Sequence, residues 1–269
     1  MKIGNRIIDL KERTYVMGIL NITPDSFSDG GNYNNIDAAV KRAKEMVEEG
    51  ADIIDIGGES TRPGASYVSE DEEIKRVVPI IKAIKNELDV LISIDTYKSR
   101  TAEEAIKAGA DIINDVWGLK KDINMAKVIA KYNVPCIIMH NRENKPYTNL
   151  MKNILDDLID SINIALDAGI KRDKIILDPG IGFAKTYEEN LEVINNVEKI
   201  AKLGFPILLA TSRKSVIGLT LDLPVDKRVE GTIATTVIGI MKGCNIVRVH
   251  DVLENKRACV MTDKIIKSK

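Results

Sequence analysis

One short pattern recurs along the chain and restricts its fold more than any other feature. Gly-Ala-Asp-Ile-Ile opens residues 50–55 and 109–114, and a looser copy, Gly-Cys-Asn-Ile-Val, opens residues 243–248. Each copy follows a helix-like segment, so we expect its glycine to supply the left-handed residue that ends the helix and its apolar pair to form the core of a strand. Self-similar helix–strand units of this kind indicate a repeated β/α architecture.

Strand-like and helix-like segments alternate along the rest of the chain. The apolar run at 15–20 is typical of a strand buried on both faces. Apolar residues then recur at helical spacing from 36 to 47, and Ser69 with Glu72 has the spacing of a capping box before the next helix. The eight strands are expected at 15–20, 53–56, 90–95, 110–115, 134–139, 174–177, 206–210 and 245–249.

This order of segments predicts the fold class. Eight strands alternating with helices over 269 residues predict an α/β fold, a single (β/α)8 TIM barrel, with a short N-terminal strand or hairpin at residues 2–10. An open doubly wound sheet is the alternative. It requires a glycine-rich phosphate-binding turn after the first strand, where Asn21-Ile22-Thr23-Pro24 stands instead. No linker interrupts the chain, so we expect one domain over residues 1–269.

Charge and composition exclude several classes of partner. The 39 basic and 40 acidic residues nearly cancel, so we expect neither a nucleic-acid nor a membrane-surface partner. Charged residues interrupt the first stretch, so no signal peptide is expected, and the longest uncharged apolar run, 231–241, is too short to span a bilayer. Cys136, Cys244 and Cys259 lack metal-binding spacing and are interpreted as buried small residues in a reducing compartment. We therefore expect a cytoplasmic protein.

Polar residues follow every predicted strand. In a barrel, the carboxyl ends of the strands meet at one rim, where active sites are built. Strand ends are often polar for solvation alone, so the joint placement around one rim carries more weight than any single residue. The residues in question are Asn21, the loop at 57–65, Asp95, Asn114, Asp115, His140, Asp178, the turn at 212–215, Arg248 and His250.

Two groups among these residues suggest a ligand. Arg248 and His250 are two residues apart and share a strand face, and together with Arg62 and Lys214 they could hold a diphosphate. Alternatively, His250 is a rim or helix-cap residue before the next helix.

The second group is Asp95, Asn114 and Asp178, which supply acceptors and one amide. These suit a flat heterocycle with an amidine-like N–H edge. Asp178 precedes Pro-Gly and could instead be a turn residue. Asp25 and Asp29, which flank Phe27 in the first loop, could be metal ligands, lid residues or turn formers.

Seven motifs together resemble the dihydropteroate synthase family. They occur in order at residues 21–31, 57–64, 93–96, 113–115, 178–183, 212–215 and 248–251. The resemblance implies an enzyme of folate biosynthesis that joins 4-aminobenzoate to 6-hydroxymethyl-7,8-dihydropterin diphosphate, giving 7,8-dihydropteroate and pyrophosphate. It also implies Mg²⁺ as a cofactor and a homodimer formed through the last helices.

The resemblance further implies a role for individual residues. The catalytic residues would be Asp95, Lys214 and Arg62. The pterin pocket would comprise Asp95, Asn114, Asp178, Lys214 and Arg248, with Arg248 stacked on the ring. Asn21, Arg62, Arg248 and His250 would hold the diphosphate, with Mg²⁺ at Asn21. Phe27, Thr61, Pro63, Phe183, Lys214 and Ser215 would contact 4-aminobenzoate.

Two other functions are compatible with a pterin pocket. A methyltetrahydrofolate-binding methyltransferase domain would share the pocket Asp and Asn but lack the Arg62 loop and the turn at 212–214, both of which this chain has. A non-catalytic pterin-binding subunit would be expected to lose Arg62, Lys214 or His250, and all three are present. The chain also departs from the family pattern at Ala184, where glycine is frequent, which bears on loop geometry.

Overall fold

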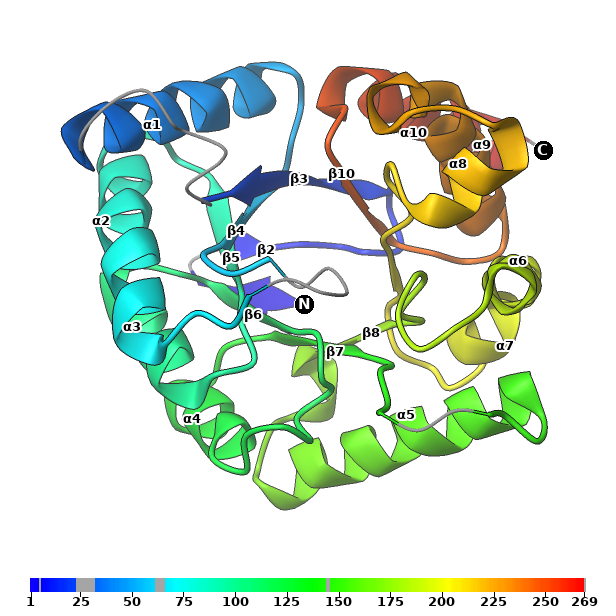
Figure 1. Ribbon diagram of the computed structural model, residues 1–269, viewed down its shortest axis with the longest axis horizontal. Helices are drawn as coiled ribbons and strands as arrows, with labels where there is room; N and C mark the ends of the chain where they lie inside the picture. The colour runs from blue at the N-terminus through cyan, green and yellow to red at the C-terminus, as the bar shows by residue number, and fades with distance from the viewer. Residues whose placement is uncertain (5, 23–31, 61–65, 144–145, 269) are drawn as a thin grey trace.

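The computed structural model describes residues 1–4, 6–22, 32–60, 66–143 and 146–268. Strands occupy the centre of the molecule and helices surround them (Figure 1). The eight strands of the larger sheet are β3 (Tyr15–Asn21), β4 (Ile53–Gly57), β5 (Leu91–Asp95), β6 (Ile112–Asp115), β7 (Cys136–Met139), β8 (Ile175–Asp178), β9 (Leu208–Leu209) and β10 (Ile246–Val249).

The eight strands form a parallel barrel. Their order is β8-β7-β6-β5-β4-β3-β10-β9, and every pairing between neighbours is parallel. A parallel bridge between Leu177 and Ile207 joins the two edges of this order, and the Leu177 N–H donates to the Pro206 carbonyl at 2.9 Å. The predicted (β/α)8 barrel is therefore confirmed, and the open doubly wound sheet is wrong.

The helices lie outside the barrel and connect successive strands (Figure 1). They are α1 (Asn32–Glu48), α2 (Glu70–Glu87), α3 (Ser99–Ala108), α4 (Met125–Tyr132), α5 (Leu150–Asp167), α6 (Tyr187–Asn195), α7 (Glu198–Ala201), α8 (Ser215–Leu221), α9 (Val229–Met241) and α10 (Val252–Lys267), with short 3₁₀ turns η2 (Arg172–Lys174) and η3 (Val225–Lys227). None of the helices in the described ranges has both the length and the apolar character needed to cross a membrane.

The repeated glycine pattern has the backbone conformation that the sequence predicts. Gly50, Gly109 and Gly243 have φ values of 103°, 118° and 98°, which lie in the left-handed region that favours glycine. The glycine of each copy therefore ends a helix or its last turn immediately before a strand.

The polar residue of the pattern has a structural role that the sequence did not reveal. Asp52 accepts a hydrogen bond from the Val16 N–H at 2.9 Å, Asp111 accepts from the Ile92 N–H at 2.9 Å, and Asn245 accepts from the Ile207 N–H at 2.9 Å. In all three copies, the side chain before one strand binds the backbone at the beginning of a neighbouring strand. The pattern thus fixes how adjacent strands start relative to each other.

The half of the barrel interior nearer the amino ends of the strands is apolar. The N-terminal hairpin of β1 (Lys2–Ile3) and β2 (Arg6–Ile7) is antiparallel, as predicted. Ile3, Ile8 and Leu10 from this region pack with one inward side chain from most of the barrel strands, a cluster that also contains Tyr15, Met17, Ile53, Leu91, Ile112, Ile137, Ile176, Leu208, Ala210 and Ile246. Because the hairpin and these side chains fill the half at the amino ends of the strands, the inward positions nearer the carboxyl ends remain for polar groups.

Candidate active site

A layer of buried polar side chains lies inside the barrel above the apolar cluster. Side chains along a strand alternate between its two faces, so Asp55 follows Ile53 into the interior and Asn114 follows Ile112. The same alternation places Arg248 above Ile246. The buried polar members of this layer are Asp55, Ser93, Asp95, Asn114 and Asp178.

Arg248 connects two carboxylates of this layer. Its Nε donates to Asp55 Oδ2 at 2.6 Å and a terminal nitrogen donates to Asp95 Oδ2 at 2.7 Å. Asp55 Oδ2 also accepts from Asn114 Nδ2 at 3.3 Å. Burial raises the pKa of Asp95 to about 7, although the positive charge of Arg248 opposes that shift. Burial by itself would lower the pKa of Arg248, but Asp55 and Asp95 together raise it, so the guanidinium stays charged.

Three oxygen atoms of the layer are available to a ligand. Asp55 Oδ1, Ser93 Oγ and Asp95 Oδ1 are buried and have no hydrogen-bond partner within the described ranges. Buried polar atoms in folded proteins nearly always have a partner. Two carboxylate oxygens and one hydroxyl aimed into a barrel interior therefore suit a bound molecule that carries N–H donors.

Asp55 was missed by the sequence analysis. It lies within the apolar run at 53–56 and does not end a strand. The expectation that site residues follow the strand ends therefore did not include it. One signal was present, because an acidic residue inside a strand buried on both faces needs a partner for its charge. Arg248 is that partner.

Lys214 and Asp178 border the same interior on the side formed by β8 and β9. Lys214 Nζ donates to the Ile181 carbonyl and lies 4.9 Å from the centroid of the Phe183 ring. Burial lowers the pKa of Lys214 to about 8, while Asp178 opposes that shift. Asp178 is buried, which raises its pKa, and its Oδ1 accepts from the Gly180 N–H at 2.7 Å. The turn role considered for Asp178 is thus correct, and the carboxylate is also part of the polar layer.

His250 lies at the rim, beside the turn that follows β9. Its Nδ1 is 2.9 Å from Ser212 Oγ, and its backbone N–H donates to the same oxygen at 3.1 Å. The N-cap residue of α10 is Asp251, which also pairs with Arg213 through Nε and Oδ2 at 3.0 Å. His250 is therefore not the cap of that helix, and it links the carboxyl ends of β9 and β10.

Two of the strand-end residues singled out in the sequence have structural roles. Asp115 accepts from the backbone N–H groups of Trp117 and Leu119, both at 2.8 Å, and so holds a turn. His140 is buried, with Nε2 3.0 Å from Asp157 and Nδ1 2.9 Å from Lys185 Nζ. Burial lowers the pKa of His140 to about 4, so its ring is neutral at pH 7.

Lys185 connects His140 to the loop that carries Phe183. Its Nζ donates to the carbonyls of Gly180 at 2.9 Å and Phe183 at 3.1 Å. The loop includes Ala184 at φ 49°, a left-handed conformation that glycine adopts more readily. The departure from the family pattern at Ala184 therefore falls at a position with an unfavourable backbone conformation.

The remaining predicted residues belong to the two long loops and the start of α8. Asn21 ends β3 and is exposed, and Ser215 begins α8. Phe27, Thr61, Arg62 and Pro63, with Asp25 and Asp29, lie outside the described residues. The structure thus brings together Asp95, Asn114, Asp178, Lys214 and Arg248, the whole predicted pterin set.

Comparisons with known proteins point to one family. Residues 17–250 match the family described as pterin binding enzyme. The chain is 68% identical over 268 residues to the dihydropteroate synthase of Clostridium beijerinckii, covering 99% of this chain and 100% of the relative. It is similar to a crystal structure of dihydropteroate synthase from Clostridium difficile in the presence of pteroic acid, with a TM-score of 0.95, 57% identity, and coverage of 97% of this chain and 100% of that one. A Xanthomonas albilineans dihydropteroate synthase with 4-aminobenzoic acid has a TM-score of 0.91 at 37% identity, covering 96% of this chain and 94% of that one.

Proposed function

The chain belongs to the pterin-binding enzyme family, and we infer that it catalyses the reaction of the dihydropteroate synthases. In that reaction, 4-aminobenzoate and 6-hydroxymethyl-7,8-dihydropterin diphosphate give 7,8-dihydropteroate and pyrophosphate. The observation that carries the inference is the pair of buried carboxylates, Asp55 and Asp95, each with one oxygen that has no partner in the described part of the chain. An N–H-rich heterocycle such as a pterin supplies the donors that these oxygens lack.

The pterin is proposed to bind against the polar layer. Asp95 and Asp178 would accept its ring N–H groups, Asn114 would supply an amide, and Lys214 would donate to a ring acceptor. Asp95 Oδ1 is available for this contact even while Oδ2 accepts from Arg248. Arg248 would lie against the ring face, because Asp55 and Asp95 hold its guanidinium inside the barrel.

The diphosphate is proposed to bind at the rim, between Asn21, Arg62, Arg248 and His250. No group of three acidic, histidine or cysteine side chains within the described ranges could hold a metal ion by itself. Mg²⁺ usually binds through one or two protein oxygens together with substrate phosphates and water, so a site for it at the rim requires no such group. Asn21 would supply the protein oxygen. When bound, the ion would neutralise charge that develops on the leaving pyrophosphate.

Bond breaking is proposed to precede bond making. The C–O bond between the methylene group and the diphosphate breaks first, and Asp95 and Asp178 favour the resulting cationic pterin. The amine of 4-aminobenzoate then forms the C–N bond and loses one proton. An aromatic amine is already neutral at pH 7, so no strong base is required and positioning carries much of the catalysis.

The 4-aminobenzoate site is proposed to lie beside Phe183, Lys214 and Ser215, with Phe27, Thr61 and Pro63 completing it. The support is geometric, because Lys214 Nζ lies 4.9 Å from the Phe183 ring and Ser215 follows Lys214 in the chain. The same lysine would thus touch both substrates at their point of union.

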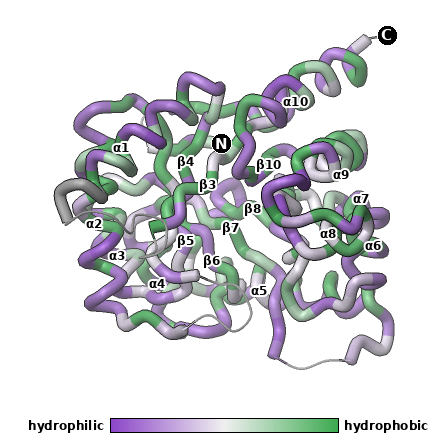
Figure 2. The backbone as a smooth tube through the Cα atoms, turned by 45° about the horizontal axis from the view of Figure 1, so that its top comes forward, coloured by the Kyte–Doolittle hydropathy of each residue, from purple (hydrophilic) through white to green (hydrophobic). Residues whose placement is uncertain are grey.

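A homodimer through the last helices is also proposed. Exposed apolar side chains gather on α8, α9, α10 and η3, namely Leu219, Leu221, Val225, Ile238, Met241, Val260, Met261, Ile265 and Ile266. The end of α10 projects beyond the body of the molecule (Figure 2). Exposed apolar side chains that gather on neighbouring helices are typical of association sites. Sedimentation equilibrium tests the proposal, and a mass of one chain at micromolar concentration would overturn it.

A cytoplasmic location is proposed as well. Cys136, Cys244 and Cys259 are all buried and unpaired. Burial raises the pKa of each thiol. Three unreactive free thiols are compatible with a reducing compartment.

One assay tests the enzymatic proposal. The purified protein is incubated with both substrates and Mg²⁺, and dihydropteroate and pyrophosphate are measured. We expect both products in equal amounts and a lower rate when Mg²⁺ is chelated. Folded protein that forms neither product would exclude this function. Consumption of methyltetrahydrofolate in the presence of a corrinoid protein would instead support the methyltransferase alternative.

A further inference from the structure

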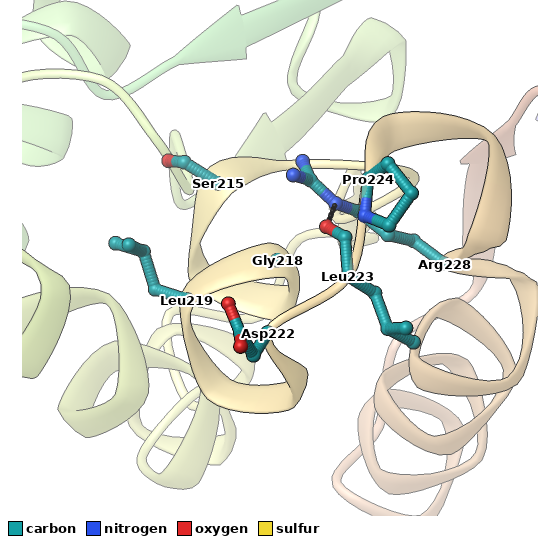
Figure 3. Close-up of a pocket in the computed structure, with 7 residues that line it drawn as sticks. All are labelled: Ser215, Gly218, Leu219, Asp222, Leu223, Pro224 and Arg228. Carbon is teal, nitrogen blue, oxygen red and sulfur yellow. Dashed lines mark hydrogen bonds between the residues drawn. The ribbon is translucent and has the colours of Figure 1, made fainter.

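Arg228 connects the start of α9 to the turn that carries Lys214. Its terminal nitrogen donates to the Arg213 carbonyl at 3.0 Å and to the Lys214 carbonyl at 3.4 Å. Its Nε donates to the Leu223 carbonyl at 2.9 Å, the contact drawn in Figure 3. Within the described ranges, the hydrogen bonds of the guanidinium all go to main-chain carbonyls, and it forms no ion pair with a carboxylate. Its contacts therefore fix backbone rather than neutralise a charge.

Gly218 makes room for this guanidinium. A Cβ atom at position 218 would lie 2.1 Å from a terminal nitrogen of Arg228 and 2.2 Å from its central carbon. Figure 3 shows Arg228 beside the first turns of α8, at a surface pocket that Ser215 and Gly218 also line. Only glycine at position 218 leaves this space, so the helix that begins after Lys214 is shaped around Arg228.

The turn that Arg228 binds has an unfavourable backbone conformation. Arg213 has φ 57°, although it is not glycine, and such a residue persists only where its surroundings fix it. The Arg213 N–H donates to Thr232 at 3.2 Å and its side chain pairs with Asp251. Arg228 and Thr232 thus hold the turn from the α9 side, and Asp251 holds it from α10.

We propose that Arg228 is a positioning residue for the reaction, because it fixes the backbone from which Lys214 and Ser215 reach the substrates. This inference rests on the proposed function. Lys214 Nζ reaches the Ile181 carbonyl and the Phe183 ring, so a shift of its backbone moves it relative to both substrate sites. A displacement of about 1 Å at a catalytic group can cost on the order of a hundredfold in rate.

Steady-state kinetics of Arg228→Met test the proposal. Methionine keeps the apolar stem and removes the donors. We expect KM for both substrates to rise by about tenfold or more, because Lys214 and Ser215 lose their positions. A role confined to stability would lower kcat with the folded fraction and leave both KM values unchanged, and that result would overturn the proposal.

Arg172→Met is the matched control. Arg172 donates to the Leu203 carbonyl at 2.9 Å and lies 3.8 Å from the Phe205 ring centroid, in a turn that precedes β8 at the opposite end of the barrel. Its removal also deprives a loop carbonyl of an arginine, so we expect lower stability with both KM values unchanged. Equal KM increases in the two variants would show that the effect is not specific to Arg228.

Gly218→Ala provides a second, independent variant if Arg228→Met does not fold. The added methyl displaces the guanidinium without removing it, and we expect the same rise in both KM values. Wild-type KM values in folded Gly218→Ala would overturn the proposal. Failure of the proposed function is distinguishable, because the unaltered protein would then form no dihydropteroate.

Discussion

Arg248 and Asp55 form an ion pair across the barrel interior, with Nε 2.6 Å from Oδ2. Their strands, β10 and β4, are not neighbours, because β3 lies between them. Asp55 is fully buried and Arg248 is largely so. The pair therefore links two halves of the polar layer, and Asp55 fixes the arginine that is proposed to meet the pterin.

Removal of the Asp55 side chain should affect both stability and catalysis. In Asp55→Ala, the buried Arg248 keeps only Asp95, and we expect the free energy of unfolding to fall by about 3 kcal/mol. Asp55→Asn preserves the shape of the side chain and should cost less stability. Through the lost charged contact it should lower kcat/KM, which corresponds to a loss of about 1.5–3 kcal/mol of transition-state stabilisation. Urea unfolding and initial rates measure both effects. Unchanged kcat/KM in folded Asp55→Asn would show that the pterin does not depend on this carboxylate.

Activity should follow the ionisation of Asp95 and Lys214. The pKa of Asp95 is raised to about 7 by burial and that of Lys214 is lowered to about 8 by burial. The proposed roles require an ionised Asp95 and a protonated Lys214, so kcat/KM should rise through pH 7 and fall through pH 8. In Asp95→Asn the acid limb should disappear while the basic limb stays. A profile that is flat through both values would contradict these roles.

The same shift at Asp95 should make stability depend on pH. The carboxyl binds its proton more tightly in the folded chain than in the unfolded chain, where its pKa is about 3.9. Its contribution to the free energy of unfolding is therefore fully present below about pH 4 and is lost as the pH rises to 7. The difference in unfolding free energy between the unaltered protein and Asp95→Asn should change across this window. A constant difference would show that the pKa of Asp95 is the same in both states.

The sequence predicts the barrel and the meeting of polar strand ends for clear physical reasons. The alternation of apolar strands and helices determines the fold, and the carboxyl ends of parallel strands must meet, so Asp95, Asn114 and Asp178 come together. The direction in which a strand-end side chain points is not contained in that rule. Asp115 ends a strand and yet holds a turn, and His140 follows a strand but is buried against Asp157 and Lys185. Asp55 lies two residues before the end of its strand and is part of the candidate site. Side-chain direction depends on register, which the pattern alone did not supply.

Arg62 and His250 provide a test of the diphosphate assignment. Each is proposed to make one charged contact with the leaving group, so Arg62→Ala or His250→Ala should reduce transition-state stabilisation by at least about 1.5–3 kcal/mol. The measurement is kcat/KM for the dihydropterin diphosphate. His140→Asn serves as a comparison, because the His140 ring is buried against Asp157 and Lys185 and has no proposed contact with the diphosphate. Wild-type kcat/KM in both alanine variants would remove the assignment.

Ala184→Gly should leave stability unchanged or raise the free energy of unfolding by up to about 1 kcal/mol. Glycine relieves the strain of the left-handed conformation at φ 49° and loses part of that gain through the entropy of the unfolded chain. Ala168→Gly is the matched control, because Ala168 has φ −76°, where alanine is unstrained. It should cost about 0.5–1 kcal/mol. Equal losses of unfolding free energy in the two variants would mean that Ala184 carries no strain.

Lys98 should make a large contribution to stability because two buried glutamates depend on it. Its Nζ donates to Glu59 and, at 2.7 Å, to Glu73, and the exposed fractions of the three side chains are 5%, 11% and 1%. It also donates to the Val68 carbonyl at 2.7 Å. In Lys98→Met, both carboxylates lose their buried partner, and we expect the free energy of unfolding to fall by about 3–5 kcal/mol.

The pH dependence of that loss separates lost charge from lost packing. Burial already raises the pKa of Glu73 although Lys98 opposes the shift, and removal of Lys98 should raise it further. A carboxyl whose pKa is higher in the folded chain contributes less to the free energy of unfolding as the pH rises. The stability deficit of Lys98→Met should therefore be smaller at about pH 5 than at about pH 8. Lys131→Met is the exposed comparison, because Lys131 is 64% exposed where it pairs with Glu103, and its loss should change the free energy of unfolding little at either pH. A deficit for Lys98→Met that stays constant with pH would mean that lost packing, rather than two uncompensated glutamates, destabilises the variant.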